Sequence, residues 1–198
     1  MVWVLLGHRS GDNGQALALA AALGWPFVAK RLRYNRLHHA PNWLLGTTRR
    51  HTEPASDPLE PPWPDLVVAV GKRSVPVARW IRRQSPGRTA LVQIGRPFAP
   101  LRDFDLIVTT PQYGLPSAPN VLDILLPLNR PDPAAMAAAA EAWAPRLAHL
   151  PRPWTAVLVG GRSVPYRMDA SAGAALVAAA DTARLGGSLL VTTSPRTP

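Results

Sequence analysis

The sequence contains no cysteine, and it has lysine only at Lys30 and Lys72. The lack of cysteine excludes disulfide bonds and thiolate metal sites, and it fits a reducing compartment. No apolar run reaches about 18 residues, the length that a membrane-spanning helix needs. The opening segment, Met1–His8, has no basic region and is too short for a signal peptide. We therefore expect a cytoplasmic protein whose first segment is a strand.

The basic residues that are present are nearly all arginine, and they give the 198-residue chain a formal charge of +10. A guanidinium group donates two parallel hydrogen bonds to phosphate, so anionic lipid or a phosphorylated substrate is a suitable partner. Part of this charge reflects the Ala-, Pro- and Arg-rich composition of the whole chain. Motifs that read bases, such as zinc fingers, are absent, so we do not expect nucleic acid as a partner.

Short apolar runs that end at glycine or proline alternate with helical patterns, which is typical of a parallel sheet with helices on its faces. In the first part of the chain, the predicted strands are Val2–Leu6, Phe27–Leu32, Leu66–Val70, Thr89–Ile94, Leu106–Thr109 and Val121–Leu125. The predicted helices are Gln15–Leu23, Ser74–Arg83 and Ala134–Leu147, the last interrupted by Pro145.

Two local expectations accompany these elements. Ser74 is the predicted N-cap of the second helix, whose Arg79, Arg82 and Arg83 are predicted to point outward. The segment His51–Pro64 is rich in proline and acidic residues, and it is predicted to be a surface loop.

A second α/β pattern begins after the linker His149–Pro153. Its predicted strands, Trp154–Val159 and Ser188–Thr193, flank a predicted helix over Ser171–Ala183. We therefore predict an α/β fold in which a Rossmann-like parallel sheet occupies an N-terminal domain, residues 1–150. Residues 151–198 are predicted to be the first βαβ unit of a second Rossmann-like domain, which is incomplete because a domain needs at least about 50 residues.

The segment Gly7–Gln15 follows the first strand, where ligands bind in open α/β sheets. Its glycine spacing is Gly-x3-Gly-x2-Gly and differs from the dinucleotide fingerprint, which disfavours a nicotinamide cofactor. Asp12 and His8 are the acid or base candidates in this segment. Asp12 has an alternative role as a helix cap.

Three further strands are also followed by polar or cationic residues. Gly71–Ser74 suits a phosphate or another anion without being a Walker loop, although Lys72 and Arg73 have solvated loop charges as an alternative. Gln93–Pro97 and Thr109–Gly114 form a polar rim suited to the hydroxyls of a saccharide or a lipid-linked acceptor. The predicted substrate-binding residues are Gly11, Asn13, Gln15, Lys72, Arg73, Ser74, Gln93, Arg96, Thr110, Gln112 and Tyr113.

In the second domain, a Gly-Gly turn and a Ser/Thr/Arg turn follow the two strands. Side by side they could hold a diphosphate, although simple tight turns are the alternative. The candidate nucleotide-binding residues are Gly160, Gly161, Arg162, Ser163, Thr193, Ser194, Arg196 and Thr197.

Two other clusters attract weaker interpretations. His38 and His39 have no carboxylate or further histidine at ligand spacing, so we expect no metal site. The basic and aromatic stretch Tyr34–Leu45 could face a membrane surface, but we favour a helix packed on the sheet.

Five motifs, in order over nearly the whole chain, closely resemble the mitochondrial-fission ELM-type family. They are Gly11–Gln15, Val70–Pro76, Gln93–Pro97, Val108–Tyr113 and Thr192–Thr197. Bacterial members of that family are described as glycosyltransferases of the GtrOC type, and plant members are linked to organelle division through recruitment of a dynamin-like protein. The resemblance implies a GT-B architecture, in which two Rossmann-like domains face one another across a cleft. It also implies that the second domain binds the nucleotide-sugar, while the first binds the acceptor and supplies Asp12, or failing that His8, as the base.

The resemblance therefore predicts transfer of a sugar from a nucleotide-sugar donor to an envelope or lipid-linked acceptor, without a cofactor. Family members continue past the Thr192–Thr197 motif, so this chain is expected to be an incomplete form that lacks most of the nucleotide site. The alternative is a non-catalytic adaptor that contacts the inner face of an anionic membrane through Arg31–Arg50. A third possibility, an NAD-type epimerase, is disfavoured by the glycine spacing.

Overall fold

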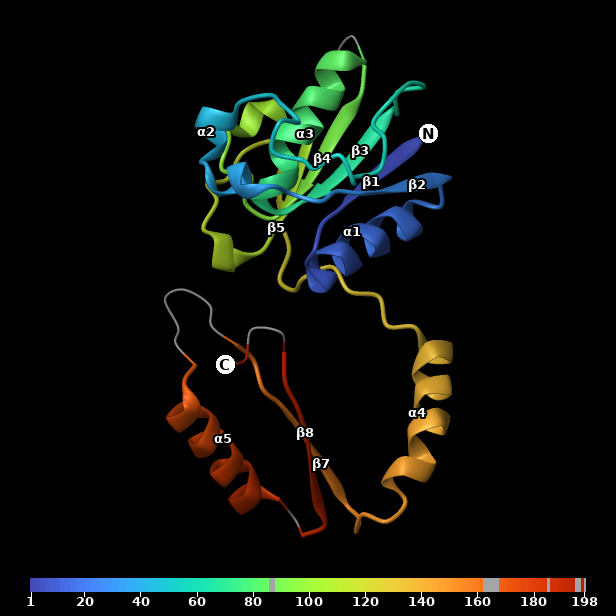
Figure 1. Ribbon diagram of the computed structural model, residues 1–198, viewed down its shortest axis with the longest axis vertical. Helices are drawn as coiled ribbons and strands as arrows, with labels where there is room; N and C mark the ends of the chain where they lie inside the picture. Colours follow the sequence, from blue (N-terminus) through green and yellow to red (C-terminus); the bar gives the residue numbers. More distant parts are fainter. Residues whose placement is uncertain (86–87, 162–167, 185, 195–196, 198) are drawn as a thin grey trace. The chain divides into compact units, whose positions relative to one another are not determined.

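The computed structural model describes residues 1–85, 88–161, 168–184, 186–194 and 197. The chain divides into two compact units, Met1–Arg130 and Pro131–Pro198 (Figure 1). Helix α4 (Pro133–Leu147) thus groups with the second unit, whereas the sequence places the division at residue 150. The predicted α/β class is confirmed, with a Rossmann-like parallel sheet in the first unit and a small parallel sheet in the second.

The first unit is built on a six-stranded sheet in which every neighbouring pair is parallel, in the order β2-β1-β3-β4-β5-β6. All six predicted strands are present, with ends that differ by two residues or fewer. The strands are β1 (Val2–Leu6), β2 (Phe27–Arg31), β3 (Leu66–Val70), β4 (Ala90–Ile94), β5 (Leu106–Thr109) and β6 (Val121–Asp123).

Side chains of the central strands alternate between two hydrophobic cores, one on each face of the sheet. Trp3 and Leu5 of β1 pack with helix α3 (Gly71–Gln84), and Val4 packs with helix α1 (Ser10–Leu23). The chain leaves β1 toward β2 on one side and returns as β3 on the other side. This reversal of strand order creates a crevice at the carboxyl ends of β1 and β3, which is where ligands bind in such sheets.

Both helices next to this crevice begin earlier than the sequence predicts. Helix α3 follows β3 directly, because Gly71 has a positive φ of 70° that turns the strand sharply into the helix. The predicted N-cap at Ser74 is therefore wrong. Its hydroxyl lies inside the first turn and donates to the carbonyls of Val70 (2.9 Å) and Gly71 (3.0 Å).

Helix α1 begins at Ser10 with Arg9 as its N-cap residue, so Gly11–Gln15 lie in the first turns of the helix and not in a loop. The cap role considered for Asp12 is wrong, since the N-cap position carries no side-chain hydrogen bond. Helix α4 is likewise continuous through Pro145, which was predicted to interrupt it. Pro145 lies near the C-terminal end of the helix, so few turns follow the disturbed position.

The segment His51–Pro64 is only partly the surface loop that the sequence predicts. Its Leu59 is buried in the core on the α3 side, where Trp63 packs between Trp3 (5.9 Å) and Trp80 (5.7 Å between ring centroids). Its Asp57 exchanges hydrogen bonds with the backbone of β2 and covers that edge of the sheet. The loop thus fills a part of the α3 face that α3 leaves open.

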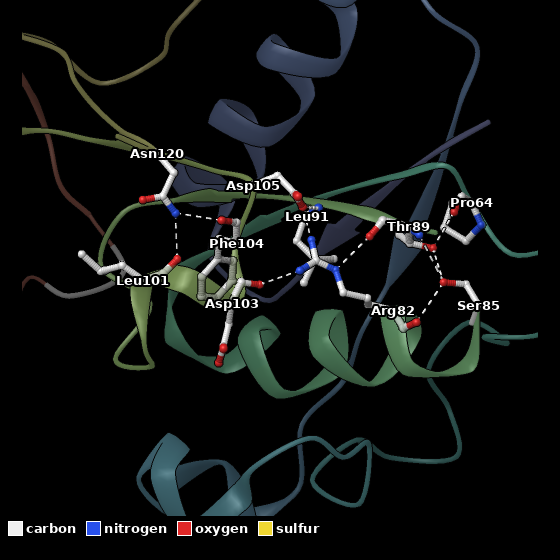
Figure 2. A network of polar contacts seen from close by, with 10 residues as sticks. All are labelled: Pro64, Arg82, Ser85, Thr89, Leu91, Leu101, Asp103, Phe104, Asp105 and Asn120. Atoms are coloured by element: carbon white, nitrogen blue, oxygen red, sulfur yellow. Dashed lines mark hydrogen bonds and ion pairs between the residues drawn. The ribbon is translucent and has the colours of Figure 1, made fainter. Parts of the chain in front are cut away.

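Arg82 organises a polar network at the opposite end of the sheet from the crevice (Figure 2). Its guanidinium donates to the carbonyls of Thr89 (2.9 Å) and Asp103 (3.0 Å), and it pairs with the carboxylate of Asp105. Arg79 forms an ion pair with Asp103 at 3.1 Å. The prediction that both arginines simply point outward is therefore wrong, because the turns at this end present carbonyls and carboxylates that bind them.

The second unit contains two parallel strands, β7 (Trp154–Leu158) and β8 (Ser188–Thr192), joined by helix α5 (Ala170–Ala183) (Figure 1). This is the predicted βαβ pattern. The side chain of Asp169 caps α5 by accepting a hydrogen bond from Ala172 N (2.9 Å). Throughout the described ranges, no helix combines the length and apolar character needed to cross a bilayer.

Candidate functional site

A cavity of ≈ 270 Å³ opens in the first unit at the crevice between β1 and β3, and extends past the ends of β4 and β5. Most of the predicted catalytic and substrate-binding residues line it: His8, Asp12, Asn13, Gln15, Lys72, Arg73, Arg96, Thr110, Gln112 and Tyr113. Three predicted residues, Gly11, Ser74 and Gln93, do not. Gln93 is fully buried beneath the cavity and donates to the carbonyls of Gly71 (3.2 Å) and Ile94 (2.9 Å).

Asn13 fixes the connection between β1 and α1. Its Oδ1 accepts from the backbone N–H of Gly7 and its Nδ2 donates to the carbonyl of the same residue, both at 2.8 Å. A side chain from the first helical turn therefore satisfies both backbone groups at the end of β1. This pair of hydrogen bonds holds His8 and Asp12 in fixed positions on the cavity wall.

Asp12 reaches across the crevice toward the start of α3. A Cβ atom placed on Gly71 would lie 3.6 Å from its Oδ2, so the carboxylate lies over this glycine. Within the part of the chain that the structure describes, Asp12 makes no hydrogen bond and no ion pair. It is also the one acidic residue on the cavity wall. Both carboxylate oxygens are thus available to a ligand.

His8 lies in the same cavity with a different environment. The Nη1 of Arg73 is 2.9 Å from its Nδ1 and 2.8 Å from its Nε2. Burial lowers the pKa of His8 below its ordinary value, and the positive charges of Arg73 and Arg9 lower this pKa further. The lowered pKa favours the neutral imidazole, which can accept a hydrogen bond from the guanidinium of Arg73.

The remaining wall is strongly cationic and includes Arg9, Lys72, Arg73 and Arg96. The N-termini of α1 and α3 converge at the same place, and each presents unpaired backbone N–H groups. Arg96 is held by a hydrogen bond from its Nη1 to the carbonyl of Tyr113 (3.1 Å). Such an environment favours an anionic or polyhydroxylated ligand.

The sequence interpretation missed Asn42 and His51, which hold the turn at the start of α3. Asn42 Nδ2 donates to the carbonyls of Lys72 (2.9 Å) and Pro97 (2.8 Å), and His51 Nε2 donates to the carbonyl of Arg73 (2.8 Å). Both side chains are buried, and burial lowers the pKa of His51. Their partners lie at least 22 residues away in the sequence, so no local pattern could have identified them.

Tyr34 is a further missed residue, and it lines the cavity wall. Its ring stacks on that of His51, with centroids 5.5 Å apart and planes 14° apart. Burial raises the pKa of its phenol above the ordinary value. The aromatic stretch that contains it did signal a structured segment, but its position beside the first strand is a tertiary feature.

The stretch Tyr34–Leu45 does not form the helix on the sheet that we favoured. It contains a 3₁₀ helix, Arg36–His39, and the short helix α2 (Asn42–Leu45), which packs against α3. Trp43 is 80% exposed, because a helix of one turn provides too little surface to cover a side chain of this size.

In the second unit, the two predicted turns lie together at the carboxyl ends of β7 and β8. Thr197 Oγ1 donates to the carbonyl of Gly160 (2.8 Å) and accepts from the backbone N–H of Ser194 (2.9 Å). Gly161 and Thr193 adjoin these contacts in the sequence. The candidates Arg162, Ser163 and Arg196 lie outside the described residues.

The fold and the cavity define a Rossmann-like α/β protein with a cationic strand-end site, in which the carboxylate of Asp12 forms no hydrogen bond or ion pair with the described residues. A family model described as "Mitochondrial fission ELM1" matches residues 10–198, and the chain belongs to this family. A curated relative, "Uncharacterized protein RP120" of Rickettsia prowazekii (strain Madrid E), is 33% identical over 109 residues, which cover 54% of this chain and 30% of the relative. No solved structure matches the chain. The family predicted from the five motifs is thus confirmed.

Proposed function

We propose that the chain forms the acceptor side and part of the donor side of a GT-B-type glycosyltransferase. It transfers a sugar from a nucleotide-sugar donor to an envelope or lipid-linked saccharide acceptor. The observation that supports this most directly is the carboxylate of Asp12, which forms no hydrogen bond or ion pair with the described residues and lies in the cavity beside two helix N-termini. A general base needs such access to a substrate hydroxyl.

In the proposed reaction, Asp12 removes the proton of the acceptor hydroxyl as its oxygen attacks the anomeric carbon. The bond from that carbon to the nucleoside diphosphate breaks, and the diphosphate leaves with the bonding electron pair. The turns at Gly160 and Thr197, which lie together at the carboxyl ends of β7 and β8, are the proposed binding segment for the diphosphate of the donor. Asp12 is a better base than His8, because Arg73 already donates to the imidazole.

The test is sugar transfer from UDP-, GDP- and CMP-sugars to a membrane extract, together with melting temperatures in the presence of each donor. Asp12→Asn should lower transfer by about 100-fold or more, in line with the loss of a general base, and leave the fold intact. The matched control is Glu60→Gln, which removes an exposed acid outside the cavity. If no donor is transferred and none raises the melting temperature of the folded protein, the proposal is overturned.

The second candidate is a membrane-surface adaptor, and the exposed side chains of Leu37, Trp43 and Leu44 favour it. These apolar groups lie among arginines, as interfacial segments require. An adaptor would be insensitive to Asp12→Asn. It would co-sediment with phosphatidylglycerol vesicles and lose this binding on the double change Trp43→Ser and Leu44→Ser. A soluble transferase would not co-sediment with these vesicles in either form.

A further inference from the structure

A second cavity, of ≈ 550 Å³, lies at the carboxyl ends of β1 and β2, also within the first unit. Both cavities are lined by Gly7, His8, Asn13, Tyr34 and Arg73, so the two spaces meet around the His8–Arg73 pair. The predicted substrate-binding residues that line the second cavity also line the first. It therefore needs an explanation of its own.

The wall of the second cavity carries three arginines, Arg31, Arg33 and Arg73, and one acidic residue, Glu53. In the described part of the chain, none of the three guanidinium groups forms an ion pair with a carboxylate. The net charge of these four groups is +2, from three cations and one anion. Like charges that share a cavity repel one another, and a bound anion relieves this repulsion.

Arg31 and Arg33 are held in place by their backbone groups, and no contact with the described residues occupies their guanidinium groups. The N–H of Arg31 donates to Asp57 Oδ2 (2.8 Å), and the N–H of Arg33 donates to Ser56 Oγ (2.9 Å). Leu32, between them, is buried in the core. Both arginine side chains are themselves exposed, so their charge is not consumed by folding contacts.

We propose that this second cavity binds a dianionic phosphoryl group, either a phosphate monoester or a diphosphate diester, through Arg31, Arg33 and Arg73. Guanidinium groups bind phosphate oxygens in pairs, and a dianion matches the net charge of the wall. As a statement about the acceptor, this rests on the proposed glycosyltransferase. The acceptor would then be a phosphorylated saccharide whose phosphoryl group lies in the second cavity and whose attacking hydroxyl lies beside Asp12.

The test is isothermal titration of the protein with inorganic pyrophosphate, in the absence of any nucleotide-sugar. The double variant Arg31→Gln and Arg33→Gln should bind at least about tenfold more weakly, since it loses charge-assisted hydrogen bonds. Glu53→Gln should bind about threefold more tightly, because it removes the one negative charge on the wall. This expected gain cannot be mistaken for misfolding.

Two controls locate the site. Arg83→Gln with Arg102→Gln removes the same charge from exposed positions outside both cavities and should leave the affinity within about twofold. Lys72→Gln with Arg96→Gln removes it from the first cavity alone. If the second pair weakens pyrophosphate binding and the Arg31 and Arg33 changes do not, or if pyrophosphate does not bind at all, the proposal is overturned.

A vesicle arm distinguishes the source of the phosphoryl group. Co-sedimentation with phosphatidylcholine vesicles that contain phosphatidic acid, competed by pyrophosphate, assigns the site to a lipid phosphate. Pyrophosphate binding without vesicle binding assigns it to a soluble phosphate ester. Asp12→Asn does not touch this cavity and should retain pyrophosphate binding, so failure of the transferase proposal and failure of this one give different results.

Discussion

At the scale of single residues, the two candidate bases Asp12 and His8 differ in their hydrogen bonds, although both line the same cavity. Asp12 has no partner among the described residues, whereas His8 accepts a hydrogen bond from Arg73. A carboxylate without a donor keeps its lone pairs for a substrate, and an imidazole that already accepts from a cation does not. In the proposed reaction, His8 therefore orients Arg73 at the boundary of the two cavities and leaves the role of base to Asp12.

The state of His8 can be measured from its ring resonances as the pH is varied by NMR. We expect its pKa to lie below the ordinary value of 6.5, chiefly from burial and secondly from Arg73. Arg73→Gln should raise this pKa, because it removes a positive charge that disfavours the imidazolium. Arg88→Gln, beyond the C-terminal end of α3, should not change it. An unchanged pKa in the Arg73 variant would contradict the contact.

At the scale of elements, the site depends on the way α1 and α3 begin. Each helix follows its strand after a very short connection, so both N-termini meet at the crevice. Asn13 closes the first connection, and Asn42 together with His51 closes the second from a distant segment. These buried hydrogen bonds hold the cations of the turn in place, so residues that contact no ligand still determine the geometry of the cavity.

The other end of α3 allows a matched test of how the helix is anchored. Arg82→Met should lower the free energy of unfolding by about 1–3 kcal/mol, because it leaves the carbonyls of Thr89 and Asp103 without a donor (Figure 2). We do not assign much of this to the pair with Asp105, which is half exposed. Arg83→Met, the exposed neighbour, should cost less than about 0.5 kcal/mol. Equal losses in urea denaturation would show that the network contributes nothing.

At the scale of the whole molecule, burial lowers the pKa of three histidines of the first unit: His8, His38 and His51. The unfolded chain then binds more protons than the folded one as the pH falls below their ordinary value of 6.5. Stability is therefore complete above that pH and is lost as the pH falls through the lower folded values. His51 is the most deeply buried of the three and should contribute most.

Acidification should accordingly reduce the urea midpoint between about pH 7.5 and about pH 5. His51→Gln keeps a donor for the carbonyl of Arg73 but does not titrate, so it should make this pH dependence shallower. A wild-type midpoint that does not fall with pH would contradict the shifts.

The strands, the α/β class and the strand-end location of the site could be predicted from the sequence, because they depend on local features. Hydrophobic runs such as Val2–Leu6 and turns such as the one at Gly71 depend on a few adjacent residues. Local rules failed where a second signal nearby overrides the first. Ser74 has the chemistry of a cap, yet the glycine before it starts the helix earlier.

What the sequence alone determined was the set of elements and the polar residues at their ends. Only the tertiary structure decided the strand order, and with it which ends meet. Arg73 lies against His8 across 65 positions, and His51 is buried although it begins a segment predicted to be a surface loop. The second cavity was equally inaccessible, since Arg31, Arg33 and Arg73 come together only when β2 and β3 flank β1. Contacts between distant segments follow from how the sheet is assembled, which no short stretch of sequence encodes.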